Sequence, residues 1–506
     1  MRWPSQTPSD GVMFAVGADQ ASVPIVWLHA LAASTILFAA SMATYSVLRH
    51  QNLWSDVYDL GQEVQVHWNT AQGRLFESSV EVQNNLGDHV TLVNMITAAV
   101  YRLFPAPQTL LILQPIIYAL GAIWAFRIGL FFLGSPALAW LTAIAYLGQP
   151  AAAYAIGYDF HPMVYAAPFA LACFDAAIRG RVLVTWLLFG LLLACREDAG
   201  MTAAAIGVFV ATSTPRRKTG LAMTALGLAW FVVAMFFILP AVRGGPSDAI
   251  EKYACFGDTS TQILRNILTR PDMVADRLLE DTRRISFIPS LSLPWLGASM
   301  LTVSGWIGMV LTCGLGILSE SPTKFTIGMS QPLVAMPVVT IAGVLGVRRL
   351  MRWFGAGGSH RGAITIAILW LVALGVLNCD NVVVRNRWQM SHNPLRQQLD
   401  VLRPFIPPDA PLSVTSKLGP HFCNRRQVAI YPITEWSRSE FPKLDQRRAT
   451  HVLIQLTQAR LRPEDHVPDP EHYTLIAKTH ALRLYELKHQ VAAGVEREDW
   501  GDGVLD

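Results

Sequence analysis

The segment from Trp54 to His89 begins with WSDVYDLG at positions 54–61 and ends with NLGDH at positions 85–89. It is polar, acidic and aromatic, and it lies between two long apolar segments. A loop that carries ionisable groups between membrane spans is a common place for binding and catalysis. We therefore take this segment as the feature around which the rest of the chain is organised.

The composition points to a membrane protein. Hydrophobic residues make up 52% of the chain, charged residues 15%, and the mean hydropathy is +0.34. Soluble domains usually carry about 25% charged residues. The apolar residues gather into runs of about 17–25, the length that crosses a bilayer core. We predict an α-helical polytopic membrane protein. The net charge of +4 is small, and the absence of a basic stripe argues against a nucleic-acid partner.

About eleven spans are expected. The first runs from about Val23 to Val47 and is predicted to be an uncleaved signal anchor. Val90–Phe104 is apolar but short and is followed by Pro105, so we predict a helix on the membrane surface. The remaining predicted spans are Thr109–Phe132, Pro136–Ile156, Pro162–Ile178, Val182–Ala194, Ala199–Val210, Leu221–Leu239, Leu291–Val303, Trp306–Leu318, Pro332–Val347 and Ala363–Leu377.

The basic residues indicate the orientation. In this layout one side of the membrane collects Arg127, Arg179, Arg181, the run Arg216–Lys218, Arg348, Arg349, Arg352 and Arg361. The positive-inside rule makes that side cytoplasmic. The acidic interruptions all fall on the other side. The sequence therefore predicts a multi-pass protein of the plasma (inner) membrane with its C-terminal domain outside the cytoplasm.

We expect three parts along the chain. Residues 1–378 form the transmembrane domain, with a first outer loop at 48–106 and another outer loop at 243–286. Residues 379–490 form a small α/β domain, and the acidic tail 491–506 is disordered. The predicted strands are Leu412–Thr415, Val428–Tyr431, His451–Leu456 and Leu482–Leu487. A disulfide between two of Cys255, Cys379 and Cys423 is left open.

Three ionisable residues of the first loop share a helical face. Asp59, Glu63 and His67 are spaced four residues apart. A carboxylate near the membrane surface can act as a general base or bind a cation. The alternative is a solvated helix face without chemistry.

Two further acid–histidine groups interrupt the apolar segments. Asp88 could cap the next helix, which leaves His89 free to bind metal or phosphate. Asp159 and His161 lie in a turn before Pro162, a residue suited to the first position of a helix. The proline is explained by structure alone, whereas Asp159 and His161 remain candidate site residues.

Arg196-Glu197-Asp198 interrupts the apolar stretch from Val182 to Val210. Charges at that depth are costly and usually face a cavity or a partner. The alternative is a tight outer turn with an internal ion pair. In either case we expect Arg196 to neutralise a neighbouring acid. The later outer loop is basic, so it could hold a lipid phosphate or be an ordinary solvated loop.

Several short motifs together resemble a known family. They are Tyr58-Asp59-Leu60-Gly61, Gln65, Trp68-Asn69-Thr70, Gly73-Arg74, Phe76-Glu77-Ser78-Ser79, Leu86-Gly87-Asp88-His89, Phe160-His161-Pro162, Arg196-Glu197-Asp198-Ala199-Gly200, Ile406-Pro407-Pro408-Asp409-Ala410 and Pro420-His421. In order and spacing they resemble the bacterial and archaeal membrane family known as domain of unknown function 2079, from about Asp56 to Leu487. Departures from its pattern are Val64, Met163 and the stretch Lys324–Thr326.

The resemblance implies an architecture similar to the GT-C glycosyltransferases, such as the aminoarabinose and protein-mannose transferases. In those enzymes a first outer loop carries the catalytic Asp, which matches Asp59. By analogy Asp88 and His89 become candidates for the same cleft. The residues expected to bind substrate are Glu63, His67, Arg74, Asp159, His161, Arg196, Glu197 and Asp198.

The function implied is transfer of a sugar from a polyprenyl-phosphate donor to an acceptor at the outer face of the membrane, with membrane lipid as a further partner. Asp59 would remove the acceptor's proton, and basic outer residues would neutralise the leaving phosphate. Involvement of a divalent cation is left open. The alternative is a non-catalytic transport or assembly protein on the same scaffold.

Overall fold

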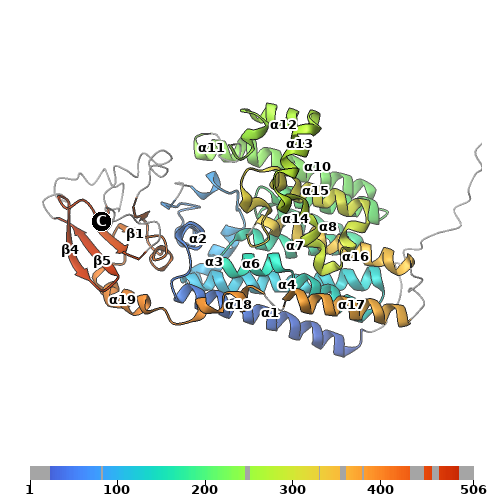
Figure 1. Cartoon of the computed structure of the whole chain (residues 1–506), viewed down its shortest axis with the longest axis horizontal. Helices are drawn as coiled ribbons and strands as arrows, with labels where there is room; N and C mark the ends of the chain where they lie inside the picture. Colours follow the sequence, from blue (N-terminus) through green and yellow to red (C-terminus); the bar gives the residue numbers. More distant parts are fainter. Residues whose placement is uncertain are drawn as a thin grey trace, which may run out of the picture.

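The computed structural model describes residues 23–80, 84–245, 251–329, 331–353, 360–378, 381–432, 449–457 and 467–488. A body of apolar helices carries a small sheet domain at one end, with the first loop between the two (Figure 1). Residues 1–22, the tail 491–506 that was predicted to be disordered, and Cys379 of the possible disulfide lie outside the described residues.

The helices follow the apolar runs of the sequence, and proline or glycine often marks their ends. Their bounds are α1 Ile25–Gln51, α2 Gln62–Ala71, α3 Asn94–Leu103, α4 Pro107–Leu133, α5 Pro136–Leu147, α6 Pro150–Tyr158, α7 Ala166–Ile178, α8 Val182–Leu193, α9 Ala199–Ser213, α10 Arg217–Val233, α11 Leu239–Arg243, α12 Ser260–Thr269, α13 Pro271–Leu279, α14 Thr282–Ser292, α15 Val303–Leu318, α16 Met336–Trp353, α17 His360–Asn378, α18 Val382–Arg385 and α19 Pro394–Leu402.

Among the described residues, five helical segments are long and apolar enough to cross a membrane. They are Ile25–Gln51, Pro107–Leu133, Arg217–Arg243, Gln331–Trp353 and Ala367–Met390. Five shorter apolar helices accompany them, namely Pro136–Leu147, Pro162–Ile178, Val182–Leu193, Ala199–Ser213 and Val303–Leu318. The architecture is that of a polytopic helical membrane protein, while the expected number of eleven spans is not established.

Two of the predicted spans have different boundaries in the structure. Pro136–Ile156 is divided into α5 and α6, because Pro150 begins a new helix. The predicted span Leu291–Val303 is wrong. Its residues form short 3₁₀ turns, because Pro294 stops the helical hydrogen bonding and both Leu296 and Gly297 have positive φ angles.

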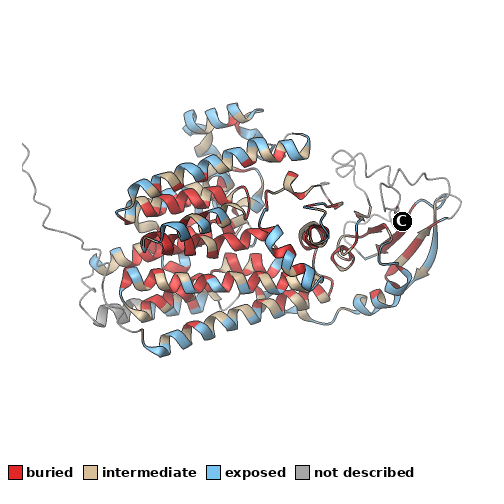
Figure 2. Cartoon of the chain, turned by 180° about the vertical axis from the view of Figure 1, so that it is seen from behind, coloured by how far each residue is buried: buried red, intermediate tan, exposed pale blue. Residues whose placement is uncertain are grey.

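The helices pack through small residues on the inside and expose apolar residues outside. Helices α9 and α10 approach so closely that a Cβ on Gly200 would lie 2.5 Å from the carbonyl oxygen of Gly227. Exposed and intermediate positions lie mainly on the peripheral helices (Figure 2). Large apolar side chains are among the exposed ones, including Leu37 of α1 and Leu183 of α8. An apolar outer surface of this kind suits contact with lipid.

Helix α3 has the character expected of a helix on the membrane surface. It contains ten residues, too few to cross a bilayer. Asn94 and Tyr101 are buried on its inner face, whereas Met95, Ile96 and Leu103 are exposed on the other. Its amphipathicity and length agree with the prediction for Val90–Phe104.

The C-terminal sheet contains five strands in the order β2-β1-β3-β5-β4. The strands are β1 Leu412–Val414, β2 Val428–Ile430, β3 His451–Gln455, β4 Tyr473–Lys478 and β5 Leu482–Leu487. β1 is parallel to both β2 and β3, whereas β5 is antiparallel to β3 and β4. Four strands were predicted. The strand β4 was not predicted; it lies at the edge of the sheet, and its side chains are mostly exposed.

The sheet domain is joined to the first loop by direct polar contacts. The carboxylate of Asp56 accepts a hydrogen bond from Ser416 at 2.6 Å and lies 3.1 Å from the ammonium of Lys417. A Cβ on Gly61 would lie 3.2 Å from the Sγ atom of Cys423, so Gly61 is suited to the close approach of this domain. Cys423 and Cys255 are both free thiols, and a disulfide between them is therefore absent.

Candidate functional site

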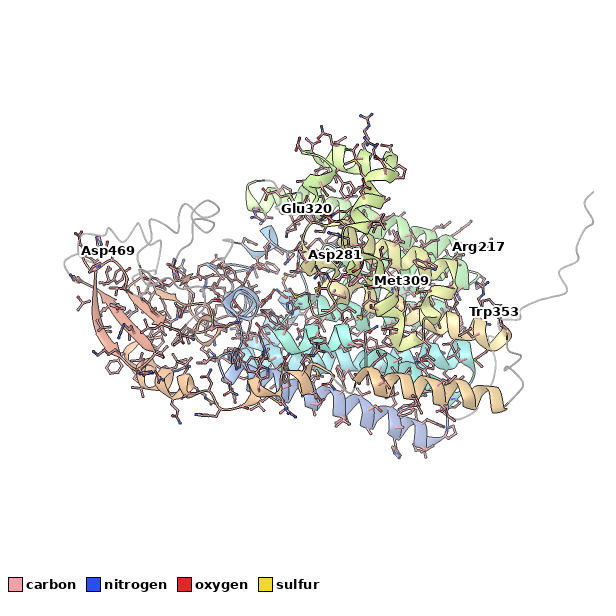
Figure 3. The ribbon with its side chains drawn as sticks, viewed as in Figure 1. Arg217, Asp281, Met309, Glu320, Trp353 and Asp469 are labelled. Carbon is pink, nitrogen blue, oxygen red and sulfur yellow. The ribbon has the colours of Figure 1, made fainter. Side chains whose placement is uncertain are left out.

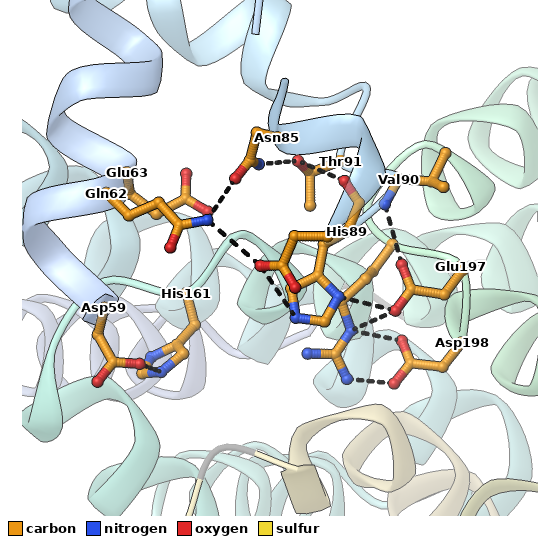
Figure 4. A network of polar contacts seen from close by, with 12 residues as sticks. Asp59, Gln62, Glu63, Asn85, His89, Val90, Thr91, His161, Glu197 and Asp198 are labelled. Carbon is orange, nitrogen blue, oxygen red and sulfur yellow. Dashed lines mark hydrogen bonds and ion pairs between the residues drawn. The ribbon is translucent and has the colours of Figure 1, made fainter. Parts of the chain in front are cut away.

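A π-helical turn at Val57–Gly61 presents Asp59. The side chain of Asp56 caps this turn by accepting the backbone N–H of Tyr58 at 3.2 Å. Turns with this geometry often occur at functional sites. The carboxylate of Asp59 is 34% exposed, and its Oδ1 atom lies 3.4 Å from Nε2 of His161. The two side chains face each other in Figure 4.

His161 comes from the loop between α6 and the 3₁₀ turn Pro162–Tyr165. Its backbone N–H donates to Oε1 of Gln114 at 2.6 Å, which fixes the loop against α4. Pro162 begins the turn, as predicted. The ring atom Nδ1 of His161 is buried without a partner among the described residues. The backbone contact with Gln114 positions His161 so that its other ring nitrogen, Nε2, is directed at Asp59.

Glu63 and His67 face inward rather than toward Asp59. His67 Nδ1 lies 2.6 Å from the carbonyl oxygen of Glu63, and its Nε2 lies 2.7 Å from Oγ1 of Thr97. Burial lowers the pKa of His67 to about 4, so the ring is neutral. Burial also raises the pKa of Glu63 to about 8, and its carboxyl accepts a hydrogen bond from Asn94 at 2.9 Å. Two of the three residues that were predicted to share a helical face, Glu63 and His67, therefore pack inside the first loop.

His89 and Glu197 form a second polar cluster. Nδ1 of His89 lies 2.9 Å from Oε1 of Glu197, whose other oxygen accepts the backbone N–H of Val90 at 3.0 Å (Figure 4). Nε2 of His89 lies 4.0 Å from a carboxylate oxygen of Asp88. Burial lowers the pKa of His89, but the charges of Asp88 and Glu197 outweigh that effect and hold it above its usual range. The cluster therefore contains an imidazolium between carboxylates.

Asp88 does not cap the following helix. Helix α3 begins at Asn94, five residues after His89, and Val93 precedes it. Asp88 instead accepts a hydrogen bond from Nε2 of Gln62 at 3.3 Å. Gln62 follows the turn that holds Asp59, so this bond links the two polar clusters. In Figure 4, Asp59 and His161 lie on one side of the network, and Glu197 and Asp198 lie on the other.

Arg196 is paired, as predicted. Its Nε donates to Oδ1 of Asp198 at 2.8 Å, and Nη2 donates to the other oxygen. Nη2 also lies 3.2 Å from Oε1 of Gln331. The turn between α8 and α9 thus contains an internal ion pair, as the alternative reading expected, and it also directs Glu197 toward His89.

A cavity of about 570 Å³ begins at this second cluster. Its ionisable and amide lining residues include Asp88, His89, Arg196, Glu197, Asp198, Arg243, Lys252, Lys324 and Gln331. The walls are largely apolar and come from α9, α10, α12, α15 and the segment before α11, with Met201, Phe231, Met235, Phe236, Ile267 and Leu311 among them. The cavity thus combines an ionic end with an apolar channel.

Lys324 supplies a free cation at the polar end. Its ammonium has no hydrogen-bond or ion-pair partner among the residues that the structure describes. Burial, helped by the positive charges of Arg196 and Lys252, lowers the pKa of Lys324 to about 8. From the sequence, this position was recognised only as a departure from a family pattern. The signal that was missed was an isolated lysine between two apolar segments.

Other predicted site residues lie away from the cavity. Asp159 is fully buried, with its carboxylate 2.7 Å from Nη1 of Arg49. Arg74 donates to Oδ1 of Asn69 at 2.9 Å, and its guanidinium lies 5.1 Å from the ring centre of Trp68. Asp59, Glu63, His67 and His161 are also absent from the residues that line this cavity.

The described residues contain no group of three or more His, Cys, Asp or Glu side chains arranged to hold a metal ion. Glu197 and Asp198 are already neutralised by His89 and Arg196. The donor set at the cavity therefore does not fit a divalent cation.

Comparisons with known proteins identify relatives at the level of family and fold. A family model described as "Predicted membrane protein (DUF2079)" matches residues 49–472. No curated protein matches the chain. The crystal structure of ArnT from Cupriavidus metallidurans bound to undecaprenyl phosphate is similar, with a TM-score of 0.50 and 10% identity over 91% of this chain and 98% of ArnT. The arabinofuranosyltransferase AftD from Mycobacteria aligns with a TM-score of 0.42 and 13% identity over 89% of this chain and 40% of AftD.

Proposed function

We infer that the protein is a glycosyltransferase that uses a polyprenyl-phosphate sugar donor. The chain belongs to the DUF2079 family of membrane proteins and has a GT-C-like architecture, and both support this inference. The acceptor would be a hydroxyl compound at the outer face of the membrane. The observation that carries this proposal is the cavity of about 570 Å³ with an ionic end and apolar walls. An amphiphile with one anionic group and a long hydrocarbon tail matches both halves.

The donor's phosphate would bind at the polar end of the cavity. Lys324 is the group best suited to it among the cations of the lining, because its ammonium has no ion-pair partner among the described residues, whereas Arg196 is paired with Asp198. Lys252 also lines the cavity but is more exposed than Lys324. A half-buried ammonium without an ion-pair partner is partly desolvated, and an incoming phosphate would relieve that cost. The prenyl chain would lie along the apolar walls, which include Phe231, Phe236 and Ile267.

The transfer step would use Asp59 as the general base. The acceptor oxygen forms a bond to the anomeric carbon of the sugar, and the bond from that carbon to the phosphate oxygen breaks. The acceptor's proton passes to the carboxylate of Asp59, while the lipid phosphate leaves with the electron pair. His161, 3.4 Å from Asp59, would hold the carboxylate in position. Lys324 would stabilise the charge on the departing phosphate.

Lys324→Met is expected to weaken binding of a polyprenyl phosphate by roughly 10- to 100-fold, the loss expected for one hydrogen bond to a charged group. Because only the protonated lysine attracts the anion, affinity in the wild type should fall as the pH rises above about 8. Binding to purified protein can be measured by fluorescence competition, from pH 6.5 to 9.5.

Lys218→Met is the matched control, since this exposed lysine is the second residue of α10, whereas Phe231 and Val232 at the other end of the helix line the cavity. It should leave affinity and its pH dependence unchanged. Equal affinity of wild type and Lys324→Met at pH 7 would overturn the assignment of the phosphate position. Failure of the wild type to prefer polyprenyl phosphate over the neutral polyprenol would overturn the proposed donor.

The proposed orientation has the sheet domain outside the cytoplasm. Arg217 and Trp353 lie at the end of the helical body farthest from Asp469 of the sheet domain, and Arg352 precedes Trp353 (Figure 3). This separation supports a cytoplasmic location for the basic end. Alkaline phosphatase fused after Leu487 should be active, and a fluorescent protein that matures only in the cytoplasm should be dark at the same position. The reverse result would contradict an outer-face reaction.

A further inference from the structure

We propose that the protein has a second lipid site, which holds the head group of an anionic membrane lipid between the ends of α2 and α3. The site lies at a cavity of about 480 Å³ lined by Trp68, Ala71, Gln72, Gly73, Tyr101, Arg102 and Pro105. It shares no lining residue with the cavity assigned to the donor. The proposal therefore goes beyond the proposed function and does not depend on it.

The inner wall of this cavity is fixed by hydrogen bonds. The hydroxyl of Tyr101 donates to Oδ1 of Asn424 at 2.5 Å, and Nδ2 of Asn424 donates to the carbonyl oxygen of Pro105 at 2.7 Å. A Cβ on Gly73 would meet no atom within 4 Å, so the backbone at the rim is open. The cavity is therefore preformed and accessible from outside.

The charge of the cavity favours an anion. Arg102 is exposed and has no ion-pair partner among the described residues, and no carboxylate lines the cavity. A second guanidinium, that of Arg74, lies over the ring of Trp68, with its nearest acid, Glu77, 4.0 Å away. A phosphate could accept hydrogen bonds from Arg102 and from the side-chain amide of Gln72.

The surroundings identify the anion as a lipid rather than a soluble ester. Leu103 and Phe104 are 72% and 67% exposed and directly follow Arg102. Pro105 separates them from α4, which is long and apolar enough to cross the membrane and begins at Pro107. Arg102 thus lies near the start of a membrane span, at the boundary between membrane and water. The exposed apolar side chains beside it can be covered by lipid acyl chains. Aromatic residues such as Trp68 and Tyr101 are common at this level.

The test compares binding of phosphatidylglycerol and phosphatidylcholine to the full-length protein by native mass spectrometry. We expect the wild type to bind one phosphatidylglycerol in preference to phosphatidylcholine. Arg102→Gln should weaken that binding by about fivefold, the factor expected for one basic residue near the membrane surface. Arg102→Lys, which keeps the charge, should retain most of it.

Arg396→Gln is the matched control, because Arg396 is an exposed arginine on α19 of the C-terminal region. It should leave binding unchanged. Because the two cavities share no lining residue, failure here is distinct from failure of the proposed donor site. Equal binding of phosphatidylglycerol by Arg102→Gln and wild type would overturn the proposal. Displacement of the lipid by glycerol 1-phosphate at equal concentration would also overturn it, since the site would then recognise a soluble phosphate.

Discussion

We expect Asp59→Asn to reduce sugar transfer by about 10²–10⁴-fold, the usual effect of removing a general base. The asparagine has nearly the same shape but cannot accept the proton of the acceptor hydroxyl. Asp59 is 34% exposed and contacts His161 rather than a buried cation, so the variant should fold normally. The measurement is transfer of labelled sugar from a polyprenyl-phosphate donor in proteoliposomes.

Asp400→Asn is a suitable control, because Asp400 is exposed on α19. It should retain full activity. Binding of the polyprenyl phosphate by Asp59→Asn should also remain near the wild-type level, since Asp59 is not among the residues that line the donor cavity. If Asp59→Asn transfers sugar at the normal rate and Asp88→Asn does not, the base is Asp88. If neither matters, the non-catalytic alternative is favoured.

The largest expected effect on stability is at Arg49. Its guanidinium forms a buried ion pair with Asp159, with 2.7 Å between Nη1 and Oδ1. The other oxygen of Asp159 accepts the backbone N–H of Asp56 at 2.9 Å, so the pair ties the end of α1 to the first loop. Arg49→Met would leave Asp159 buried without its cation and should lower the free energy of unfolding by about 3–5 kcal/mol.

Thermal unfolding in detergent measures this effect. Burial raises the pKa of Asp159 to about 6 even though Arg49 opposes it. Without the arginine, the pKa of the Asp159 carboxyl should rise further. A folded-state pKa above the unfolded one means that stability is greatest at low pH and is lost as the pH rises through the folded pKa. Arg49→Met should therefore lose less stability at pH 5 than at pH 8.

The double variant Arg49→Met/Asp159→Asn removes both charges, so it should recover part of the loss at pH 8. Arg396→Met, at an exposed position, serves as the control and should unfold like the wild type. An unfolding temperature of Arg49→Met within about 1 °C of the wild type would show that the ion pair is not needed for stability.

The helical architecture could be predicted because it depends on local patterns. Apolar runs specify the helices, and Pro107 and Pro136 stand at the first positions of α4 and α5. The errors occurred where the run of apolar residues continues but the helical backbone conformation ends. The predicted span Leu291–Val303 is largely apolar, yet Pro294 and the positive φ of Gly297 break the helix.

The candidate site was predicted less well, because its geometry depends on contacts between distant segments. The turn Arg196–Asp198 could be recognised from charges in an apolar stretch, and its ion pair was expected. The contact between Asp59 and His161 joins residues about a hundred positions apart, so no spacing rule reveals it. Asp59, Glu63 and His67 were predicted to share a helical face. Asp59 instead lies in the π-helical turn before α2 and is partly exposed, whereas Glu63 and His67 turn inward.

The most direct test of the central claim is photo-crosslinking with a polyprenyl phosphate that carries a diazirine on its prenyl chain. The proposed function predicts labelling of the cavity walls, at Met235, Phe236 and Ile267, with competition by unlabelled polyprenyl phosphate but not by polyprenol. Labelling confined to lipid-facing positions such as Ile36 and Leu37 of α1, without such competition, would contradict it.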